Sequence, residues 1–506
     1  MGKRNSLQQK YEDSRRRLLM DRSVPGRMGV SLPPNDVPEG PLPPSDMLRD
    51  EIDFPEVTEG EIVRYFSQLS QLNFSIDHNF YPLGSCTMKY NPKVNDEVAA
   101  MRGFTEIHPL QPESTVQGAL KLMWELQEYL AAITGMPGVS LAPMAGADGE
   151  LAGMLMARAY HLDRGDTQRT KVLIPDSAHG TNPATATMSG FEVVTLPSDA
   201  RGDTDLDALR ESAGDDLAGL MITLPSTLGL FDSNIEQVVK IVRDAGGIVY
   251  GDGANLNALL GRVRMGDLGF DVMHSNLHKT FTQPHGGGGP GSGPVLVGPR
   301  LLPYLPTPWV TRQVDGGPNS APDGKKKETF GFTTPEKSIG RMAAFHGNFG
   351  ALVRAHAYIS SLGKDGVAAI SNDAVLNANY LQSQLKNDFD LPYDRVCMHE
   401  VVLSAATLKR QHGVSALDVA KRLIDYGIHP PTMYFPLIVE EALMVEPTET
   451  ESKETLDYFI EVMKTIAREA REEPSLLHDA PHDSPNTRLD EARAARQPDL
   501  RWRRRA

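Results

Sequence analysis

A short stretch in the middle of the chain brings together residue types that can do chemistry. Residues 274–294 read HSNLHKTFTQPHGGGGPGSGP, in which His274, His278, His285 and one lysine, Lys279, precede a glycine-rich run. Such a stretch could ligate a metal ion, bind a nucleotide phosphate, or present a nucleophilic amine. Each of these uses needs a different local structure, which the neighbouring residues allow us to compare.

The local pattern disfavours a metal site. His274 and His278 would face one ion if they lay on a helix, because residues four apart share a helix face. However, Asp271 and His274 fall in an apolar segment typical of a strand, and the glycines after His285 disfavour a helix there. We therefore expect no metal ion at this stretch.

The glycines also imitate a dinucleotide-binding loop. Gly286, Gly288 and Gly291 match G-x-G-x-x-G, a pattern that should follow a strand and open a helix. Here it follows TFTQPH and leads into the strand-like segment PVLVG, and Pro290 and Pro294 obstruct a helix. The context therefore disfavours a dinucleotide loop.

Lys279 fits the third use, as the lysine of a pyridoxal phosphate (PLP) site. A lysine that forms a Schiff base must be partly desolvated, so that its amine can be neutral and nucleophilic. PLP also needs an acid beside its pyridine nitrogen. Asp252, in VYGDGANLNA, ends an earlier apolar segment, and Gly253 and Ala254 after it leave room for a flat ring.

Two more segments complete this pattern. His179, in PDSAHGTNPA, could stack on the ring, and APMAGADGELAG (142–153) is a turn that enters a helix, where backbone N–H groups can bind phosphate. Each feature alone is common, since a loop lysine is usually solvated and a strand-terminal aspartate is often a helix cap. Four of them, each placed after an apolar segment, favour a PLP site.

The elements that would position these residues form an α/β domain. Apolar segments at 171–180, 191–196, 217–226, 246–253 and 271–276 alternate with amphipathic segments such as 234–246. This alternation predicts a mostly parallel sheet with helices on both faces, and ligands of such sheets bind outside the carboxyl ends of the strands. We expect a large domain over 113–355, with a first helix that stops at Gly135, and a smaller α/β domain over 356–474.

The two ends of the chain have a different composition. Residues 1–112 are rich in proline and turn residues, which predicts an extended arm that lies over the body or over a partner. Residues 475–506 are polar and end in RWRRRA, so we expect a disordered tail.

The overall composition limits the kinds of molecule that we expect the chain to bind. The net charge of −15 disfavours nucleic acid and anionic membranes as main partners, and no run of about 18 apolar residues predicts a membrane span. Only Cys86 and Cys397 are present, which fits a reducing compartment and hence the cytoplasm. We expect Cys86 to be a packed, inert thiol.

Longer motifs resemble a known family. The segments SNLHKTFTQPHGGGGPGSGP, DGANLNA, SAHGTNPA, YPLGSCTMKYNP and HPLQPESTVQGALKLMWELQEYLAAITGM are similar to the glycine-decarboxylating P-protein of the glycine cleavage system, and the resemblance runs over about residues 25–475. The length is similar to subunit 2 of the two-subunit form, which carries the PLP lysine. The resemblance implies a fold type I PLP enzyme with a large domain and a smaller C-terminal domain.

The resemblance also implies roles for individual residues. Lys279 would carry PLP covalently, Asp252 would contact the pyridinium nitrogen, and His179 would stack on the ring. The implied further contacts are the backbone of Gly146 and Ala147 at the phosphate, Thr227 near the ring hydroxyl, and Ala254, Ser275 and His278. The family often has histidine or glutamine where this chain has Asp148. A carboxylate there would repel the phosphate unless it points away.

The reaction that the resemblance implies is glycine decarboxylation, with release of CO2 and transfer of the aminomethyl group to the lipoyl group of H-protein. The implied assembly is a heterotetramer of two pairs with subunit 1. The constellation of Lys279, Asp252, His179 and the glycine turn alone also fits another fold type I enzyme, such as an aminotransferase or another amino-acid decarboxylase. A non-catalytic scaffold subunit is a further alternative, against which the presence of Lys279 and Asp252 speaks.

Overall fold

The computed structural model of the chain describes residues 17–38, 40–50, 52–286, 289, 291–314 and 328–501. The chain divides into two units, Met1–His78 and Asn79–Ala506. All of the predicted site residues belong to the second unit.

The described residues of the unit Met1–His78 are mostly irregular. Their helical elements are η1 (Leu19–Arg22), η2 (Ser45–Met47) and α2 (Glu59–Ser70). The helix α2 begins at a capping box, in which the Thr58 side chain accepts from the backbone N–H of Glu61 and the Glu61 side chain accepts from that of Thr58. Large apolar side chains in this unit are exposed, among them Met28, Leu32, Leu42, Met47 and Phe54.

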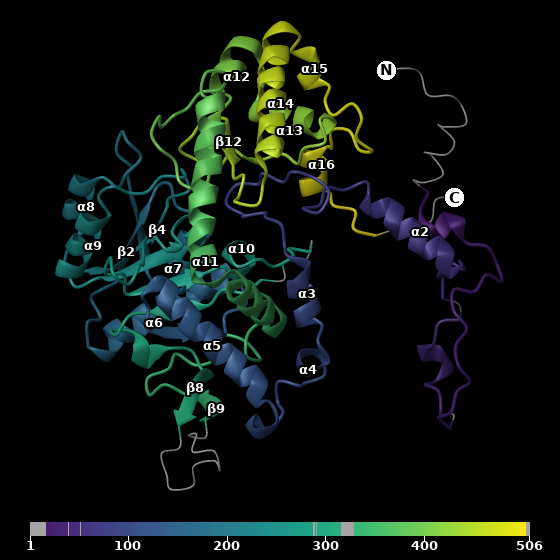
Figure 1. Ribbon diagram of the computed structural model, residues 1–506, viewed down its shortest axis with the longest axis horizontal. Coiled ribbons are helices and arrows are strands. Elements are labelled where there is room, and N and C mark those ends of the chain that lie inside the picture. Colours follow the sequence, from purple (N-terminus) through teal and green to yellow (C-terminus); the bar gives the residue numbers. More distant parts are fainter. Residues whose placement is uncertain are drawn as a thin grey trace. The chain divides into compact units, whose positions relative to one another are not determined.

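A seven-stranded sheet forms the centre of the unit Asn79–Ala506 (Figure 1). The strand order is β1-β7-β6-β5-β4-β2-β3. The strands β2 to β6 run parallel, and β7 is antiparallel to both of its neighbours. The prediction of a mostly parallel sheet is confirmed. The strand bounds are β1 (Gly138–Ser140), β2 (Lys171–Pro175), β3 (Glu192–Leu196), β4 (Leu217–Thr223), β5 (Ile248–Gly253), β6 (Val272–Ser275) and β7 (Val295–Val297).

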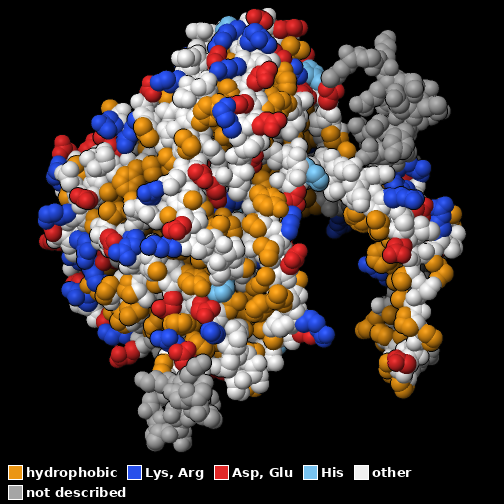
Figure 2. All heavy atoms as spheres, in the orientation of Figure 1, with side chains coloured by type: hydrophobic (Ala, Val, Ile, Leu, Met, Phe, Trp, Pro, Cys, Tyr) orange, Lys and Arg blue, Asp and Glu red, His pale blue; other side chains and the backbone are white. Residues whose placement is uncertain are grey.

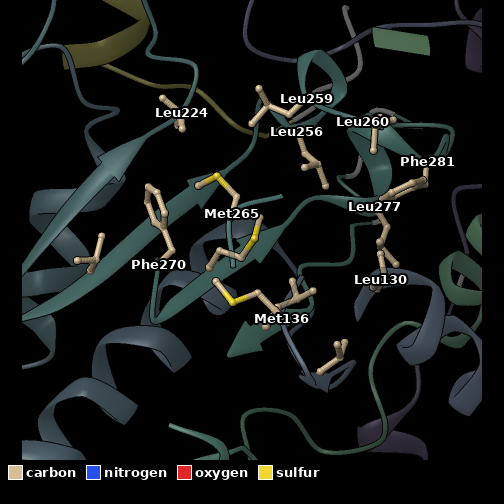
Figure 3. Packing of buried hydrophobic residues seen from close by; sticks show 14 of the residues in the cluster. Leu130, Met136, Leu224, Leu256, Leu259, Leu260, Met265, Phe270, Leu277 and Phe281 are labelled. Atoms are coloured by element: carbon tan, nitrogen blue, oxygen red, sulfur yellow. The ribbon is translucent and has the colours of Figure 1, made fainter. Parts of the chain in front are cut away.

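Helices cover both faces of this sheet because its strands are apolar on both sides. Val249 of β5 belongs to one core cluster and Tyr250, the next residue, belongs to another. Figure 3 shows the first cluster, to which Leu130, Met136, Phe270 and Leu277 belong. The helices of this part are α5 (Gln117–Thr134), α6 (Gly146–Asp163), α7 (Thr181–Met188), α8 (Leu206–Ser212), α9 (Ile235–Asp244), α10 (Leu277–Thr280) and the short η4 (Leu256–Ala258). The predicted stop at Gly135 is confirmed, since this residue caps α5 with φ 72°.

The C-terminal part has its own antiparallel sheet and core. The strands β10 (Val401–Ser404), β12 (Ala442–Val445) and β11 (Thr432–Met433) pair in that order, and α12 (Ala406–His412), α13 (Ala416–Asp425) and α14 (Lys453–Glu472) pack around them. The long α11 (Phe349–Leu385) joins this part to the seven-stranded part (Figure 1). It kinks at Gly363, whose φ of 63° favours glycine. A hairpin of β8 (Trp309–Val314) and β9 (Glu328–Thr333), with η5 (Leu302–Tyr304) before it, completes the unit.

The segment from Asn79 to residue 112 differs from the arm expected from its composition. It contains α3 (Lys93–Ala99), α4 (Arg102–Thr105) and, just after it, η3 (Glu113–Thr115), and it belongs to the second unit. Buried Lys89 donates to the Thr280 carbonyl at 2.7 Å, to Asn257 Oδ1 at 2.9 Å and to Glu449 Oε1 at 2.7 Å. These partners are remote in sequence, which is why local composition did not reveal them.

The start of the expected disordered tail is also folded against the body. The helix α15 (Ser475–His478) carries Leu477, which is fully buried, and Arg488 Nη2 lies 2.6 Å from Asp418 Oδ1 in α13. Buried apolar side chains such as Leu477 and Ala480, the Arg488–Asp418 ion pair and the hydrogen bond from His482 N to Asp425 thus hold a segment of polar composition. The helix α16 (Glu491–Arg496) follows, and of RWRRRA only Arg501 lies within the described residues.

Two surface properties bear on partners. Among the described residues, none of the helices has the length and apolar character needed to cross a membrane. On the face shown in Figure 2, Lys and Arg side chains are interspersed with Asp and Glu side chains.

Candidate active site

The predicted site residues meet at one edge of the seven-stranded sheet. Asp252 is the penultimate residue of β5. Lys279 follows β6, His179 follows β2, and Thr227 follows β4. The strand β1 points the same way as β6 because both are antiparallel to β7, so Gly146, which follows β1, lies at the same edge. This is the edge at which parallel sheets bind ligands.

Lys279 presents a free amine at this edge. It lies in α10, which begins directly after Asn276, and its side chain is half-buried. Within the described part of the chain, its Nζ has no hydrogen bond or ion pair. Its positive charge nevertheless helps to lower the pKa of Asp252, and it opposes the rise that burial causes in the pKa of the Cys86 thiol, so all three groups lie in one electrostatic environment. An unpaired, partly desolvated amine is what a covalent cofactor lysine requires.

Asp252 is buried and fixed by neighbours that favour its charged form. Its Oδ1 accepts from Ala254 N at 2.9 Å, and its Oδ2 accepts from Asn182 Nδ2 at 3.0 Å. Burial raises the pKa of this carboxyl, but His274, Asn182, Ala254 and Lys279 together bring the pKa below its ordinary value. Asp252 is therefore suited to hold a positive charge opposite its carboxylate.

A buried network supports Asp252 from behind, and the sequence did not reveal it. Tyr250 Oη lies 2.5 Å from His274 Nδ1, and His274 Nε2 lies 3.4 Å from Asp252 Oδ1. Asn182 donates to both Asp252 and Glu150, each at 3.0 Å. The role of His274 could have been predicted from the pairing of β5 with β6, because His274 is the register partner of Asp252.

Glu150, Asp252 and His274 lie close enough together to resemble a metal-ligand set. However, Asn182, Thr181, Ala254 and Tyr250 already bond to their ligand atoms. Burial, followed by the charge of Asp252, raises the pKa of the Glu150 carboxyl. The cluster therefore has the character of a hydrogen-bonded support for Asp252.

His179 and Thr227 lie on loops that are bonded to each other and to this network. His179 is exposed, its Nδ1 accepts from Thr181 N at 3.2 Å, and Thr181 Oγ1 donates to Glu150 at 2.8 Å. The buried Thr227 hydroxyl donates to the Ser177 carbonyl, two residues before His179. One edge of the exposed imidazole is thus fixed, and its ring centroid lies 5.6 Å from that of Phe435 at an interplanar angle of 68°.

The start of α6 offers unpaired groups for a phosphate. No side chain among the described residues caps this helix, so its first backbone N–H groups, including those of Gly146 and the exposed Ala147, are open to an anion. Buried Ser275 Oγ and Ser292 Oγ also lack partners in the described structure. A Cβ on Gly146 would lie 2.5 Å from Asn276 Oδ1, so the turn can hold only glycine without rearrangement.

Asp148 turns away from this helix start. Its Oδ2 accepts from Met144 N at 2.9 Å, so the carboxylate faces the preceding turn. Burial raises the pKa of the Asp148 carboxyl, and the hydrogen bond from Met144 N opposes this rise. The open N–H groups, the two unpaired serine hydroxyls and the glycine at 146 fit a phosphorylated cofactor such as PLP.

The end of the glycine-rich run packs against the same turn. A Cβ on Gly293 would collide with the Ala145 carbonyl, and one on Gly291 would lie 3.2 Å from the Met144 oxygen. Ser292 N donates to His278 Nδ1 at 3.3 Å. Burial, with the charge of Lys279, lowers the pKa of His278 to about 3, so its imidazole is neutral. Gly287, Gly288 and Pro290 lie outside the described residues, and a Cβ on Gly289 would meet open space, so close backbone approach explains Gly291 and Gly293.

A second set of residues near Lys279 was missed in the sequence. Ser85 N donates to Glu400 Oε2 at 2.8 Å, and Thr87 N donates to Glu446 Oε2 at 2.9 Å. Ser85 and Thr87 have left-handed φ values of 61° and 52°, a strained backbone that favours a functional site. Cys86 between them is mostly buried. Burial raises the pKa of its thiol, in keeping with a packed residue.

The strand order, the antiparallel β7 and a lysine after β6 define the class of the chain, which is the fold type I class of PLP-dependent enzymes. The structure is similar to a glycine decarboxylase (P-protein) of the glycine cleavage system in inhibitor-bound form. The TM-score is 0.69 at 20% identity, over 84% of this chain and 93% of that chain. It is also similar to a cysteine desulfurase from Thermococcus onnurineus NA1, with a TM-score of 0.58 at 16% identity, over 78% and 95% of the two chains.

Sequence relatives define the family. The family model for the glycine dehydrogenase C-terminal domain matches residues 370–484. A probable glycine dehydrogenase (decarboxylating) subunit 2 of Listeria monocytogenes serotype 4b is 54% identical over 96% of this chain and 98% of its own length. The protein of the same name from Desulforamulus reducens is 55% identical over 96% and 99%. The chain belongs to the family of glycine dehydrogenase (decarboxylating) subunit 2.

Proposed function

We propose that this chain is the PLP-bearing subunit of a glycine-decarboxylating enzyme of the glycine cleavage system. The observation that carries the proposal is the unpaired amine of Lys279 at a sheet edge that also presents Asp252, His179 and the open start of α6. The relatives named above, which match nearly the whole chain, favour glycine over other substrates of this fold.

The described residues could hold PLP as follows. Lys279 would bind it covalently, Asp252 would face the pyridine nitrogen, and His179 would cover one face of the ring. The phosphate would be held by backbone N–H groups at Gly146 and Ala147, with Ser275 beside them. Ala254, Thr227 and His278 would complete the contacts. When bound, PLP supplies an electron sink for the pair that remains when glycine loses CO2.

The protein's own groups would control protons and orientation. Asp252 has a depressed pKa, so it stays ionised and can keep a proton on the ring nitrogen. Asn182 and His274 fix the direction of its carboxylate. The neutral imidazole of His278 adds no positive charge beside Lys279, which leaves the amine free to lose its proton and react.

The assembly is part of the proposal. The relatives are named as a subunit 2, which implies a subunit 1, and we propose a heterotetramer of two such pairs in the cytoplasm. The lipoyl group of H-protein would accept the aminomethyl group. The exposed apolar side chains of the unit Met1–His78, such as Leu32 and Phe54, support a surface that a partner covers.

The test is exchange of labelled bicarbonate into glycine by the purified chain with PLP, subunit 1 and lipoylated H-protein. Exchange should occur with wild type and disappear with Lys279→Met. Lys240→Met on the exposed face of α9 is the control and should keep full exchange. Absence of exchange by the wild-type mixture would overturn the proposal. Amino-group transfer without H-protein would favour an aminotransferase, and failure to bind PLP would favour a scaffold.

A further inference from the structure

Three buried side chains of the C-terminal sheet face the region of Lys279. Val401 and Val445 are register partners across β10 and β12. Glu400 precedes the first and Glu446 follows the second, so the two carboxyls extend side by side from the same end of the ladder. His399 comes next to Glu400 in sequence, and all three side chains are fully buried.

Each of these three side chains has at least one nitrogen or oxygen atom without a hydrogen-bond partner in the described structure. The loop 85–87 occupies Glu400 Oε2 and Glu446 Oε2, which leaves both Oε1 atoms and the His399 ring nitrogens unbonded. His399 Nε2 lies 3.8 Å from Glu400 Oε1 and 3.9 Å from Glu446 Oε1. These distances are too long for hydrogen bonds, yet the three atoms lie within 4.8 Å of one another.

The charge balance around this cluster differs from that of other buried carboxyls. Glu449 pairs with Lys89 at 2.7 Å and Glu441 pairs with Lys409, whereas neither Glu400 nor Glu446 pairs with a lysine or arginine among the described residues. Two buried carboxylates this close cannot both be ionised without a large cost. A bound proton is the simplest way to remove one charge.

The surrounding titratable groups agree with a bound proton. Burial raises the pKa of Glu446 to about 7, and burial with the charge of Glu446 raises the pKa of Glu400 well above its ordinary value. Burial, with Lys279, lowers the pKa of His399 to about 3, so the imidazole supplies no compensating charge. Lys279 lowers the pKa of both carboxyls, and Glu449 raises that of Glu446. The Cys86 and Cys397 thiols are further titratable neighbours, and burial, with a smaller contribution from the charge of Glu400, raises the pKa of both.

We propose that Glu400 and Glu446 together carry one proton at their Oε1 atoms, so that the buried pair holds a single negative charge. The inference deepens the proposed function and rests on it, because the charge of the pair acts on the Lys279 amine, which must lose a proton before it can bond to a cofactor.

The two sheets would contribute different groups to the site. The seven-stranded sheet supplies the amine of Lys279, and the C-terminal sheet supplies the acid pair whose charge acts on that amine. Glu400 and Glu446 are thus positioning residues that act through Lys279.

Infrared titration of the full-length chain without PLP tests this proposal. Protonated carboxyls give a carbonyl band that carboxylates and amides lack, and exposed carboxyls lose it at about pH 4. We expect a component that persists to about pH 7 and is missing from both Glu400→Gln and Glu446→Gln. Lys279→Met should move its midpoint upward by about one pH unit, because the compensating cation is gone.

Glu451 provides the matched control. Burial raises its pKa to about 7 as well, so Glu451→Gln should remove a separate component whose midpoint Lys279→Met does not move. A wild-type spectrum without a Glu446-dependent component near pH 7, or one that Lys279→Met leaves unmoved, would overturn the proposal. So would stoichiometric binding of Zn2+ or Mn2+ that depends on His399 and Glu400, because the cluster would then be a metal site.

The infrared and exchange experiments distinguish failure of the shared proton from failure of the glycine activity. An infrared component that behaves as expected, in a protein that shows no bicarbonate exchange, would support the shared proton and overturn the glycine activity. Bicarbonate exchange by a protein without that component would overturn the shared proton alone.

Discussion

His274 and Asp252 are register partners on neighbouring parallel strands, and His274 Nε2 lies 3.4 Å from Asp252 Oδ1. Neither side chain can move without the sheet, because both are buried within it. The hydroxyl of Tyr250 fixes the other ring nitrogen of His274. The pairing therefore places Asp252, the acid that would face a cofactor, within a sheet that holds its carboxylate in one orientation.

Replacement of His274 should weaken PLP binding. In His274→Asn, the pKa of Asp252 loses the largest of the influences that lower it, and one pKa unit corresponds to about 1.4 kcal/mol, or about tenfold in affinity. The PLP dissociation constant, measured by absorbance titration, should rise by about that factor. Tyr250→Phe keeps the imidazole and should have a smaller effect. Equal affinity of wild type and His274→Asn would show that Asp252 does not need this neighbour.

The start of α6 should tolerate no side chain at residue 146. In Gly146→Ala the new Cβ would lie 2.5 Å from Asn276 Oδ1, which would displace the turn and its N–H groups. We expect at least about a tenfold loss of PLP affinity. Gly118→Ala, in the first turn of α5 where a Cβ meets open space, is the matched control and should bind PLP normally. If both variants bound PLP alike, the phosphate would have to be held elsewhere.

Glu446 should make stability depend on pH. Its folded pKa of about 7 lies above the ordinary value of 4.5, so the folded state retains a proton that the unfolded chain releases. Wild-type stability should therefore fall as pH rises from about 4.5 to above 7, by on the order of 2–3 kcal/mol. Glu446→Gln should lack this part of the pH dependence in urea unfolding. Glu441→Gln, at a carboxyl bonded to Lys409 and Ala416 N, should keep the wild-type dependence.

The segment after α14 should contribute to stability. A chain that ends at residue 474 loses the buried Leu477 and the Arg488–Asp418 ion pair, which should lower the free energy of unfolding by about 3 kcal/mol. A chain that ends at residue 489 keeps both and should unfold like the full chain. Thermal unfolding of the two truncated chains distinguishes them. Equal melting temperatures would mean that this segment does not hold the domain.

The fold class could be predicted because its signals are local. Apolar segments that end near Asp252 and Ser275 predict buried parallel strands. Because ligands of such sheets bind at the carboxyl ends of the strands, Lys279 is expected at a binding site from the sequence alone. The roles of Lys279, Asp252 and His179 stay predictions until a cofactor is bound. The direction of Asp148 could not be foreseen, since it depends on one hydrogen bond to Met144.

The acid pair could not be predicted for a different reason. Glu400 lies inside the apolar segment VCMHEVVLSA, and Glu446 directly follows β12. Nothing near either residue indicates that they adjoin each other, or that Ser85 and Thr87 bind them. Their nearness arises from strand pairing and from contacts between residues more than 300 positions apart, and such contacts leave no local pattern in a sequence.

The buried ammonium of Lys89 has a consequence for how the chain reaches this structure. It fills acceptors on Asn257, on Thr280 beside Lys279, and on Glu449, which is 360 residues away in sequence. During synthesis, the region around Lys279 is therefore complete only after almost the entire chain has emerged. Long-range closure of this kind slows folding, so the newly made chain spends an extended period with Lys89 unpaired and the region around Lys279 incomplete.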